Sequence, residues 1–364
     1  MRVVIACGGT GGHVTPALAI ADLLQKTVAD CEILFIGTVG GMENEMVRAA
    51  GYEICAISVK GLSRRHPKEA LAALKLLRAA VRAAGNIIDV FHPDIVIGTG
   101  GYACYPALLS AYRRGTPTAV HESNAVPGLA VRMLATKLSR VWLGFEAARA
   151  HLPRRAKTLV VGNPVRDSAL WRGGTRPMGQ SQKTVLSFGG SLGAPAMNRA
   201  VLSLMAELRD MPQIRFVHAT GKREWEGFSR ELAAAGLSGD PRLEVLPFIS
   251  DMPRRMREAT VVISRAGAMT LGEVAAAGRA AVLIPSPNVT GDHQLKNAAA
   301  LADAGAAVVV EEHRLDGGDL TRAVRRLLTD DAARREVEMA VKAFSHPDAG
   351  RKILADILLL TGRQ

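Results

Sequence analysis

Short apolar runs recur along the chain, and most are separated by stretches with helical periodicity. Residues 3–7 form one such run, which leads through a glycine-rich segment into a helical pattern from Pro16 to Leu24. Apolar strands that alternate with helices predict doubly wound parallel sheets. The runs that we interpret as strands are residues 3–7, 33–37, 94–98, 118–122, 141–143, 184–188, 215–218, 243–246, 261–264 and 281–285.

The opening pattern appears a second time in the chain. Residues 184–188, Gly189 to Gly193 and a helical pattern from Pro195 to Leu208 repeat the order of strand, glycine-rich turn and helix with an early proline, which helix starts tolerate. The repeat predicts two α/β domains, with a boundary near Gly162 to Arg166. We expect domains at 1–165 and 166–345, with a C-terminal helix at about 346–364 crossing back to the first.

Composition agrees with two domains and narrows the partners. The 364 residues are 48% hydrophobic but only 4% aromatic, and the net charge is +12. A basic surface attracts nucleic acid, anionic lipid or phosphorylated substrates. Because no nucleic-acid-binding module is recognisable, we expect no nucleic acid partner. The N-terminus lacks a signal peptide pattern, and no apolar stretch reaches the ~20 residues that span a bilayer. The chain is expected to be soluble or peripheral, with four free, buried cysteines.

The first glycine-rich loop, Gly8 to His13, does not match the common nucleotide motifs. A dinucleotide fingerprint would need glycine at Val14 and an acidic residue after the second strand, where the sequence has Gly37-Thr38. The Walker P-loop is absent as well. Backbone N–H groups of small residues can instead approach an anion or a sugar closely. The alternative is a tight turn needed only for packing.

The second half offers a stronger candidate for nucleotide binding. A strand ends at Ser264, and a helix is expected to begin around Ala268, so its N-terminus would suit a diphosphate. Glu273 would accept hydrogen bonds from ribose hydroxyls, or would stabilise the first helical turn. Further on, Asp292 to Gln294 would bind sugar hydroxyls, or would form an ordinary helix cap.

Taken together and in order, the motifs of the chain resemble those of the MurG family of cell-wall glycosyltransferases. The resemblance covers nearly the whole chain. It rests on GGTGGHVTP (8–16), GTGGY (98–102), HESN (121–124), GNPVR (162–166), GGSLGA (189–194), FISDM (248–252), the segment 265–278 and DHQLKNA (292–298).

This resemblance implies a GT-B fold, in which two Rossmann-like parallel-sheet domains face a cleft. It implies a hexosyltransferase that moves N-acetylglucosamine, with inversion, from UDP-GlcNAc to lipid I, undecaprenyl-pyrophosphoryl-MurNAc-pentapeptide, to make lipid II for the cell wall. It implies no cofactor and no metal, and no Asp-x-Asp motif is present. The implied substrate contacts are Thr10, Gly11 and Gly12 to donor sugar or acceptor diphosphate, Asn124 to N-acetylglucosamine, Arg166 and Ile249 to uracil, Ser191, Gly267, Ala268, Met269, Thr270, Leu271 and Gly272 to diphosphate, Glu273 to ribose and Gln294 to sugar hydroxyls.

The sequence departs from the family pattern at three places. Leu192 stands where the family usually has Gln, Ser123 replaces the Gln of HEQN, and residues 100–106 replace a GGYVSGP-like stretch. Leu192 removes a polar side chain from the implied diphosphate site, where backbone donors would remain. It is also the best argument for an inactive nucleotide-sugar-binding protein.

His13 is the candidate general base, because the ordinary histidine pKa of about 6.5 suits proton removal at neutral pH. A structural histidine that caps the helix is the alternative. His121 and Glu122 also end a strand, and they would orient the acceptor or supply the base instead.

A basic amphipathic helix is predicted over Lys68 to Asn86. Leu71, Leu74, Leu77 and Val81 are its apolar residues, and its cationic residues are Lys68, Lys75, Arg78 and Arg82. Such a helix can lie on an anionic membrane, or can pack on its own sheet as a solvated basic helix. We expect a peripheral enzyme on the cytoplasmic face of the plasma membrane, with cell-wall machinery proteins as further partners. The remaining enzyme alternative is a GT-B transferase with a different lipid or small-molecule acceptor.

Overall fold

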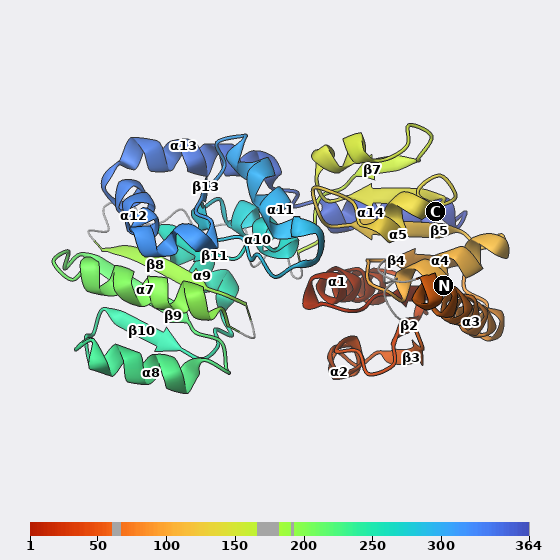
Figure 1. The fold of residues 1–364 in the computed structure, drawn as a ribbon. Helices are drawn as coiled ribbons and strands as arrows, with labels where there is room; N and C mark the ends of the chain where they lie inside the picture. The colour runs from red at the N-terminus through yellow and green to blue at the C-terminus, as the bar shows by residue number, and fades with distance from the viewer. Residues whose placement is uncertain (60–66, 166–181, 191–192, 364) are drawn as a thin grey trace. The chain divides into compact units, whose positions relative to one another are not determined.

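The computed structural model describes residues 1–59, 67–165, 182–190 and 193–363 (Figure 1). The chain divides into two compact units. The first comprises Met1–Arg166 together with His346–Gln364, and the second comprises Asp167–Ser345. The chain therefore leaves the first unit once and returns to it with its last helix.

The first unit is built on a sheet of seven parallel strands in the order β3-β2-β1-β4-β5-β6-β7. The strands are β1 (Arg2–Ala6), β2 (Glu32–Thr38), β3 (Glu53–Ile57), β4 (Ile95–Gly98), β5 (Thr118–Glu122), β6 (Arg140–Leu143) and β7 (Thr158–Val160). The helices are α1 (Gly11–Thr27), α2 (Glu43–Ala49), α3 (Pro67–Phe91), α4 (Cys104–Arg113), α5 (Leu129–Leu134), the 3₁₀ helix η1 (Glu146–His151) and α14 (Ala349–Leu360).

Helices cover both faces of this sheet. On one face, α1 and α14 contribute Leu18, Ile20 and Ile353 to a core with Ile5 and Trp142. On the other face, α3, α4 and α5 bury a separate cluster against the sheet. Figure 1 shows α14, coloured as the end of the chain, among the elements of the first unit. Its return completes one layer of the first core.

The second unit repeats the plan with six parallel strands in the order β10-β9-β8-β11-β12-β13. The strands are β8 (Lys183–Phe188), β9 (Ile214–Ala219), β10 (Leu243–Leu246), β11 (Val261–Ser264), β12 (Ala280–Leu283) and β13 (Val308–Val309). The helices are α7 (Pro195–Glu207), α8 (Trp225–Ala234), α9 (Met252–Glu258), α10 (Ala268–Ala277), η2 (Thr290–Asp292), α11 (His293–Ala302), η3 (Glu312–Gly317), α12 (Asp319–Thr329), α13 (Asp331–Val341) and η4 (Lys342–Phe344).

All ten predicted strands are present in the structure, with small differences at their ends. Three further strands, β3, β7 and β13, were not predicted, and each is the edge of its sheet. The helix predicted from Pro16 begins at Gly11, so this proline lies inside α1. Pro195, in contrast, lies in the first turn of α7 as expected.

Two other predictions concern the cysteines and membrane-spanning segments. All four cysteines are free, and Cys7, Cys31 and Cys104 are buried while Cys55 is half-buried. Within the ranges that the structure describes, no helix is both long enough and apolar enough to cross a bilayer.

The strand orders place ligand-binding edges in both units. In a doubly wound sheet, ligands bind beyond the carboxyl ends of the strands where the strand order reverses. In the first unit this point lies between β1 and β4, and in the second between β8 and β11. The loop Gly8–His13 follows β1, and Gly189 and Gly190 follow β8, so each lies at one of these points.

Candidate active site

At the switch point of the first unit, the loop after β4 packs closely against the loop after β1. Gly100 and Gly101 follow β4 with φ of 109° and 84°, which favours glycine. A Cβ on Gly101 would overlap the Gly8 carbonyl, and one on Gly100 would overlap the His13 ring. Thr99 Oγ1 donates to the His13 carbonyl at 2.7 Å. The GTGGY motif therefore provides the surface against which the first loop packs.

His13 lies in the first turn of α1, half-buried, with its ring orientation fixed by its own loop. Its Nδ1 lies 3.0 Å from the Gly8 carbonyl and 3.3 Å from Thr10 Oγ1. Since a carbonyl only accepts, Nδ1 carries the hydrogen in the neutral ring and Nε2 has the free lone pair. Among the described residues, no hydrogen-bond partner of Nε2 is found. This tautomer is the one required of a base that acts through Nε2.

Thr10, Gly11 and Gly12 lie beside that ring. Thr10 is the residue before α1 and is exposed, as is Gly12, while Gly11 is half-buried. The first-turn N–H groups of a helix have no intrahelical acceptors, so this turn presents donors to a ligand. The predicted contacts of these three residues stay predictions.

The buried carboxylate of Glu43 accepts a hydrogen bond from the Gly8–His13 loop and was not predicted from the sequence as a site residue. It accepts hydrogen bonds from Gly9 N at 3.2 Å, Thr38 N at 2.7 Å and Thr38 Oγ1 at 2.5 Å. The signal available in the sequence was an acidic residue two positions after Gly40-Gly41, where α2 begins after β2 has ended at Thr38.

In the HESN segment, His121 and Ser123 are buried and make hydrogen bonds within the first unit. His121 is fully buried, and this burial lowers its pKa to about 4. Its Nε2 donates to the Gly162 carbonyl at 3.0 Å, while Ser123 Oγ lies 3.2 Å from Nδ1. Asn163 Nδ2 donates to the Ser123 carbonyl at 3.1 Å. These bonds connect HESN to GNPVR and give His121 a structural task.

Glu122 organises the turn that presents Asn124. Its Oε1 accepts from the backbone N and the Nδ2 of Asn124, both at 3.0 Å, and its Oε2 accepts from Gly128 N at 2.8 Å. A nearly buried carboxylate with three N–H donors is suited to positioning. A part for Glu122 in proton transfer, as a catalytic residue, stays a prediction beside that of His13.

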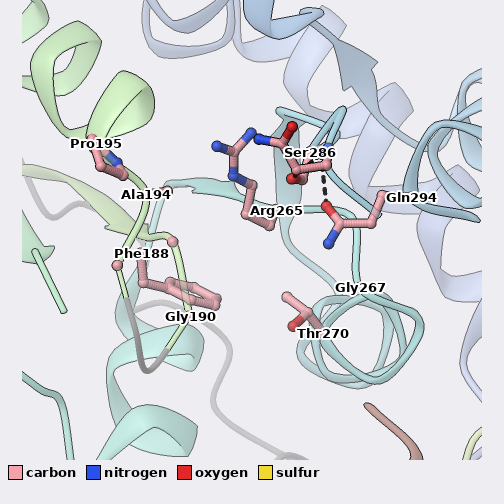
Figure 2. A pocket seen from close by; sticks show the side chains of 12 residues that line it. Phe188, Gly190, Ala194, Pro195, Arg265, Gly267, Thr270, Ser286 and Gln294 are labelled. Atoms are coloured by element: carbon pink, nitrogen blue, oxygen red, sulfur yellow. Dashed lines mark hydrogen bonds between the residues drawn. The ribbon is translucent and has the colours of Figure 1, made fainter. Parts of the chain in front are cut away.

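The switch point of the second unit contains a pocket of about 330 Å³. Figure 2 shows Gly190 and Ala194 on one side and Arg265, Gly267 and Thr270 on the other. Gly190 has φ of 95° and open space where a Cβ would lie, so the backbone itself forms that wall. The residues that line the pocket are Phe188, Gly189, Gly190, Gly193, Ala194, Pro195, Arg265, Gly267, Thr270, Ser286, Asn288 and Gln294.

Helix α10 begins at Ala268, where the sequence placed it, with its N-terminus at this pocket. Of the predicted diphosphate contacts, Gly267 and Thr270 line the pocket, while the side chains of Ala268, Met269 and Leu271 are buried. Gly272 is half-buried on the helix. Buried side chains leave only the backbone N–H groups of these positions for a ligand.

Arg265 supplies positive charge to the pocket and has defined anchors. Its guanidinium pairs with Glu312 and donates to the carbonyls of Ile284 at 3.2 Å and Pro285 at 3.4 Å. A planar guanidinium fixed in this way is suited to phosphate oxygens. The motif containing Arg265 was recognised from the sequence, but a role for its side chain was not.

Gln294 projects into the same pocket from α11. Its Oε1 accepts from Ser286 N at 2.9 Å, shown as a dashed line in Figure 2. The amide nitrogen is thus oriented as the donating end. Asp292 occupies the cap position of α11 without a side-chain capping bond, so an ordinary cap does not account for this segment.

Glu273 lies beyond the first turn of α10, which contains no acidic residue. Stabilisation of the first turn therefore does not explain it. Desolvation by surrounding protein atoms raises the pKa of Glu273 to about 7, although its side chain keeps partial exposure. Glu273 does not itself line the pocket, whereas Thr270, on the same helix, does. A carboxyl with a strongly raised pKa is a candidate functional residue, and its predicted ribose contact stays a prediction.

Three other predicted contacts have different outcomes. Arg166 and Ser191 lie outside the described residues, and so does Leu192. The side chain of Ile249 is buried, whereas the neighbouring Phe248 is exposed, with Lys222 Nζ 5.9 Å from its ring centroid. The uracil contacts stay predictions.

Helix α3 extends from Pro67 to Phe91, longer than the predicted basic helix. Lys75, Arg78 and Arg82 are exposed, and Leu74 is exposed beside them. Val81 is buried in the unit. The side chains of Lys68 and Leu71 lie outside the description. The later turns therefore pack on the sheet, and the exposed cations begin nearer its N-terminal end.

Comparison with known proteins agrees with this geometry. Residues 3–143 match the N-terminal domain of glycosyltransferase family 28, and residues 184–353 match the C-terminal domain of that family. Together with the two parallel-sheet units, these matches define a glycosyltransferase of GT-B fold.

The relatives specify the family further. A UDP-N-acetylglucosamine–N-acetylmuramyl-(pentapeptide) pyrophosphoryl-undecaprenol N-acetylglucosamine transferase of Limosilactobacillus fermentum is 37% identical, covering 98% of this chain and 97% of the relative. The same enzyme of Desulforudis audaxviator is 38% identical, covering 100% and 99%. The crystal structure of MurG from Acinetobacter baumannii superposes with a TM-score of 0.79 at 30% identity, covering 98% and 99%. The chain belongs to the MurG family.

A more distant similarity supports the fold alone. The UDP-GlcNAc 2-epimerase of Neisseria meningitidis, solved with UDP-GlcNAc, has a TM-score of 0.65 at 14% identity and covers 99% of this chain and 100% of its own.

Proposed function

We propose that this enzyme transfers N-acetylglucosamine from UDP-GlcNAc to the muramyl sugar of lipid I, producing lipid II for peptidoglycan synthesis. The observation that carries the proposal is the combination of near full-length family membership with a binding pocket at the N-terminus of α10. The second unit binds the donor, and the first binds the acceptor and supplies the base.

The donor would be bound by complementary groups in the second unit. The N-terminus of α10 and Arg265 face the diphosphate, Glu273 accepts from the ribose hydroxyls, and the amide of Gln294 donates to the sugar. As the bond between the anomeric carbon and the phosphate oxygen breaks, negative charge develops on UDP. Preorganised N–H groups and a guanidinium stabilise that charge in the transition state.

The acceptor would be activated in the first unit. Its hydroxyl oxygen attacks the anomeric carbon opposite the departing UDP, and its proton passes to Nε2 of His13. Hydrogen bonding of Nδ1 to Gly8 supports this assignment, because it leaves Nε2 unprotonated in the neutral ring. Asn124 donates a hydrogen bond to Glu122 and contributes a polar group after β5, the strand next to β4.

Membrane contact belongs to the same proposal. A polyprenyl acceptor stays in the bilayer, so the enzyme must approach its surface, and we assign this task to the exposed part of α3 with Leu74, Lys75 and Arg78. The enzyme would then act as a peripheral protein on the cytoplasmic face. Contacts with cell-wall machinery proteins are a further expectation of this placement.

Turnover with defined acceptors tests the proposal. Purified enzyme is incubated with UDP-GlcNAc and a short-chain lipid I analogue, and the disaccharide product is measured by mass spectrometry alongside released UDP. We expect product with the lipid I analogue and none with diacylglycerol or without acceptor. Transfer to diacylglycerol instead would identify a different GT-B transferase, and UDP binding without transfer to any acceptor would identify an inactive binding protein.

A further inference from the structure

The buried carboxylate of Glu43 contacts the loop that carries His13 directly, through Gly9 N. Glu43 is the first residue of α2 and has no exposed surface. A charged side chain is rarely fully buried unless its hydrogen-bonding capacity is satisfied. The groups that satisfy it therefore indicate what the carboxylate is for.

Both oxygens of Glu43 accept hydrogen bonds, and they do so from different elements. Oε1 accepts from the backbone N and the Oγ1 of Thr38 at the end of β2, at 2.7 and 2.5 Å. Oε2 accepts from Gly9 N at 3.2 Å, in the catalytic loop. These hydrogen bonds lower the pKa of Glu43 despite its burial, so the carboxylate is ionised. The side chain connects β2 to the loop after β1.

The surrounding glycines leave room only for this side chain. A Cβ on Gly8 would lie 2.5 Å from Glu43 Oε1, and one on Gly41 would also overlap the carboxylate. Gly8 and Gly9 have φ of 157° and 86°. The loop backbone therefore lies directly on the carboxylate, and its conformation depends on that contact.

The next contact in the chain reaches the proposed base. The peptide between Gly8 and Gly9 donates its N–H to Glu43 and presents its carbonyl oxygen, Gly8 O, to His13 Nδ1 at 3.0 Å. One rigid, planar peptide unit thus carries both bonds. Rotation of that unit would move the carbonyl away from the imidazole. The remaining neighbour of Nδ1 would be Thr10 Oγ1, a hydroxyl that donates as well as accepts, so the hydrogen would no longer be held on Nδ1.

We propose that Glu43 is a positioning residue for His13: by fixing the Gly8–Gly9 peptide, it sets the Nδ1–H tautomer and leaves Nε2 able to take a proton. The effect on catalysis rests on the proposed function of His13, whereas the effect on the tautomer does not. Glu43 itself does not touch the substrates.

The substitution Glu43→Gln tests this with little change in volume. Because the Oε1 position already receives two donors from Thr38, the new NH₂ must replace Oε2 and face Gly9 N–H, donor against donor. The peptide is then no longer fixed. Glu45→Gln, at an exposed position of the same helix, is the matched control.

Long-range ¹H–¹⁵N NMR of the imidazoles in the full-length enzyme gives the direct readout, with His13 assigned by its loss in His13→Ala. We expect the Nδ1–H tautomer in the wild-type enzyme and in Glu45→Gln, and a mixture with the Nε2–H tautomer in Glu43→Gln. Thr38→Val keeps the carboxylate but removes one of its hydrogen-bond donors, so it should produce a smaller fraction of the Nε2–H tautomer than Glu43→Gln does. Thr38→Ser keeps the hydroxyl donor and should show the wild-type tautomer. An unchanged His13 tautomer in both Glu43→Gln and Thr38→Val would overturn the proposal.

Kinetics separate this inference from the function on which it rests. Glu43→Gln should lower kcat about 10- to 100-fold, by analogy with the range seen for residues that orient metal-binding histidines, with the KM for UDP-GlcNAc unchanged. A tautomer shift with normal kcat in both Glu43→Gln and His13→Ala would support positioning by Glu43 while refuting His13 as the base. Normal kcat in Glu43→Gln together with a large loss in His13→Ala would overturn the catalytic part of the positioning proposal.

Discussion

Asp356, on the last helix, accepts a hydrogen bond from Trp142 Nε1 on β6 at 2.7 Å, although the two residues are 214 positions apart in the sequence. The same carboxylate accepts from Arg140 Nε at 2.9 Å. Asp356 is nearly buried, and Trp142 is among the largest fully buried side chains. This contact fixes α14 to the first unit, so the C-terminal segment is part of its core.

Loss of this contact should destabilise the first unit. Asp356→Ala leaves a buried indole N–H and a partly buried guanidinium without their acceptor, and we expect a loss of about 2–4 kcal/mol in the free energy of unfolding. Urea denaturation followed by Trp fluorescence measures it. Asp348→Ala removes an exposed ion pair with Arg351 near the same helix and should change the free energy by less than about 1 kcal/mol. Equal losses in both variants would contradict the assignment.

Much of the fold follows from the sequence because buried parallel strands read as uninterrupted apolar runs. The runs at residues 94–98 and 261–264 gave β4 and β11 in this way. Strand β3, with Glu53 and Cys55 among its residues, has only one neighbour and faces water on one side, so its pattern is mixed. Strand β13 has only two residues, too few to show the hydrophobic pattern of a strand.

The site was predictable where a loop motif and a strand end coincide, and not where a distant side chain supports it. The position of His13 after β1 and the start of α10 at Ala268 follow from local signals. The support of the first loop by Glu43 depends on tertiary approach of α2 to β1 and β2, which periodicity does not report. Likewise, nothing local indicates that Glu312 pairs with Arg265, 47 positions away.

Removal of the proposed base should act on turnover alone. His13→Ala should lower kcat at least about tenfold, consistent with the usual contribution of general-base catalysis, and should leave the Kd of UDP-GlcNAc nearly unchanged because most of the proposed donor contacts belong to the second unit. Steady-state kinetics with the lipid I analogue and calorimetric titration of the donor measure the two effects. Near-normal turnover in the variant would remove His13 from the mechanism.

The raised pKa of Glu273, about 7, predicts that donor binding releases a proton near that pH. In the proposed donor complex, ribose hydroxyls donate to the carboxylate and favour its ionised form, so binding would lower the pKa of Glu273 and release the proton. UDP-GlcNAc is the suitable ligand because its diphosphate diester does not titrate in this range. Calorimetry at pH 6.5 in two buffers of different ionisation enthalpy should show the release, and Glu273→Gln should abolish it. Equal buffer dependence in both proteins would assign the proton to another group.

The same shift affects stability with a definite sign. The folded-state pKa lies above the ordinary glutamate value, so the folded enzyme binds the proton more tightly than the unfolded chain. Its contribution to stability is fully present below the unfolded pKa of about 4.5 and is lost as pH rises through 7. The stability of Glu273→Gln relative to the wild-type enzyme should therefore increase from pH 5 to pH 8 in urea titrations. A difference independent of pH would contradict the raised pKa.

Arg265 should matter for the diphosphate more than for the nucleoside. Arg265→Ala removes a charged donor from the pocket, and we expect the Kd of UDP to rise about 10- to 100-fold, which corresponds to about 1.4–2.8 kcal/mol. The Kd of uridine should change little, because it has no phosphate. Arg314→Ala, an exposed arginine paired with Asp319 on the neighbouring segment, is the control for lost positive charge. Similar effects on UDP and uridine would indicate general damage to the pocket.

Membrane docking through α3 predicts a dependence on both anionic lipid and these particular cations. Lys75→Glu/Arg78→Glu reverses two exposed charges next to Leu74, and each basic residue near an anionic surface contributes about 1 kcal/mol. We expect the wild-type enzyme to co-sediment with vesicles containing phosphatidylglycerol but weakly with pure phosphatidylcholine. The double variant should lose most of the binding to anionic vesicles, and its turnover of a water-soluble, short-chain acceptor should be retained.

The control must change net charge equally at another place on the same unit. Arg154→Glu/Arg155→Glu meets this condition, because both residues are exposed after the 3₁₀ helix η1 and lie outside α3. If binding depends on α3, this variant should keep most of its lipid affinity. Equal losses in the two double variants would show that net charge alone brings the enzyme to the surface, and the docking role of α3 would then be rejected.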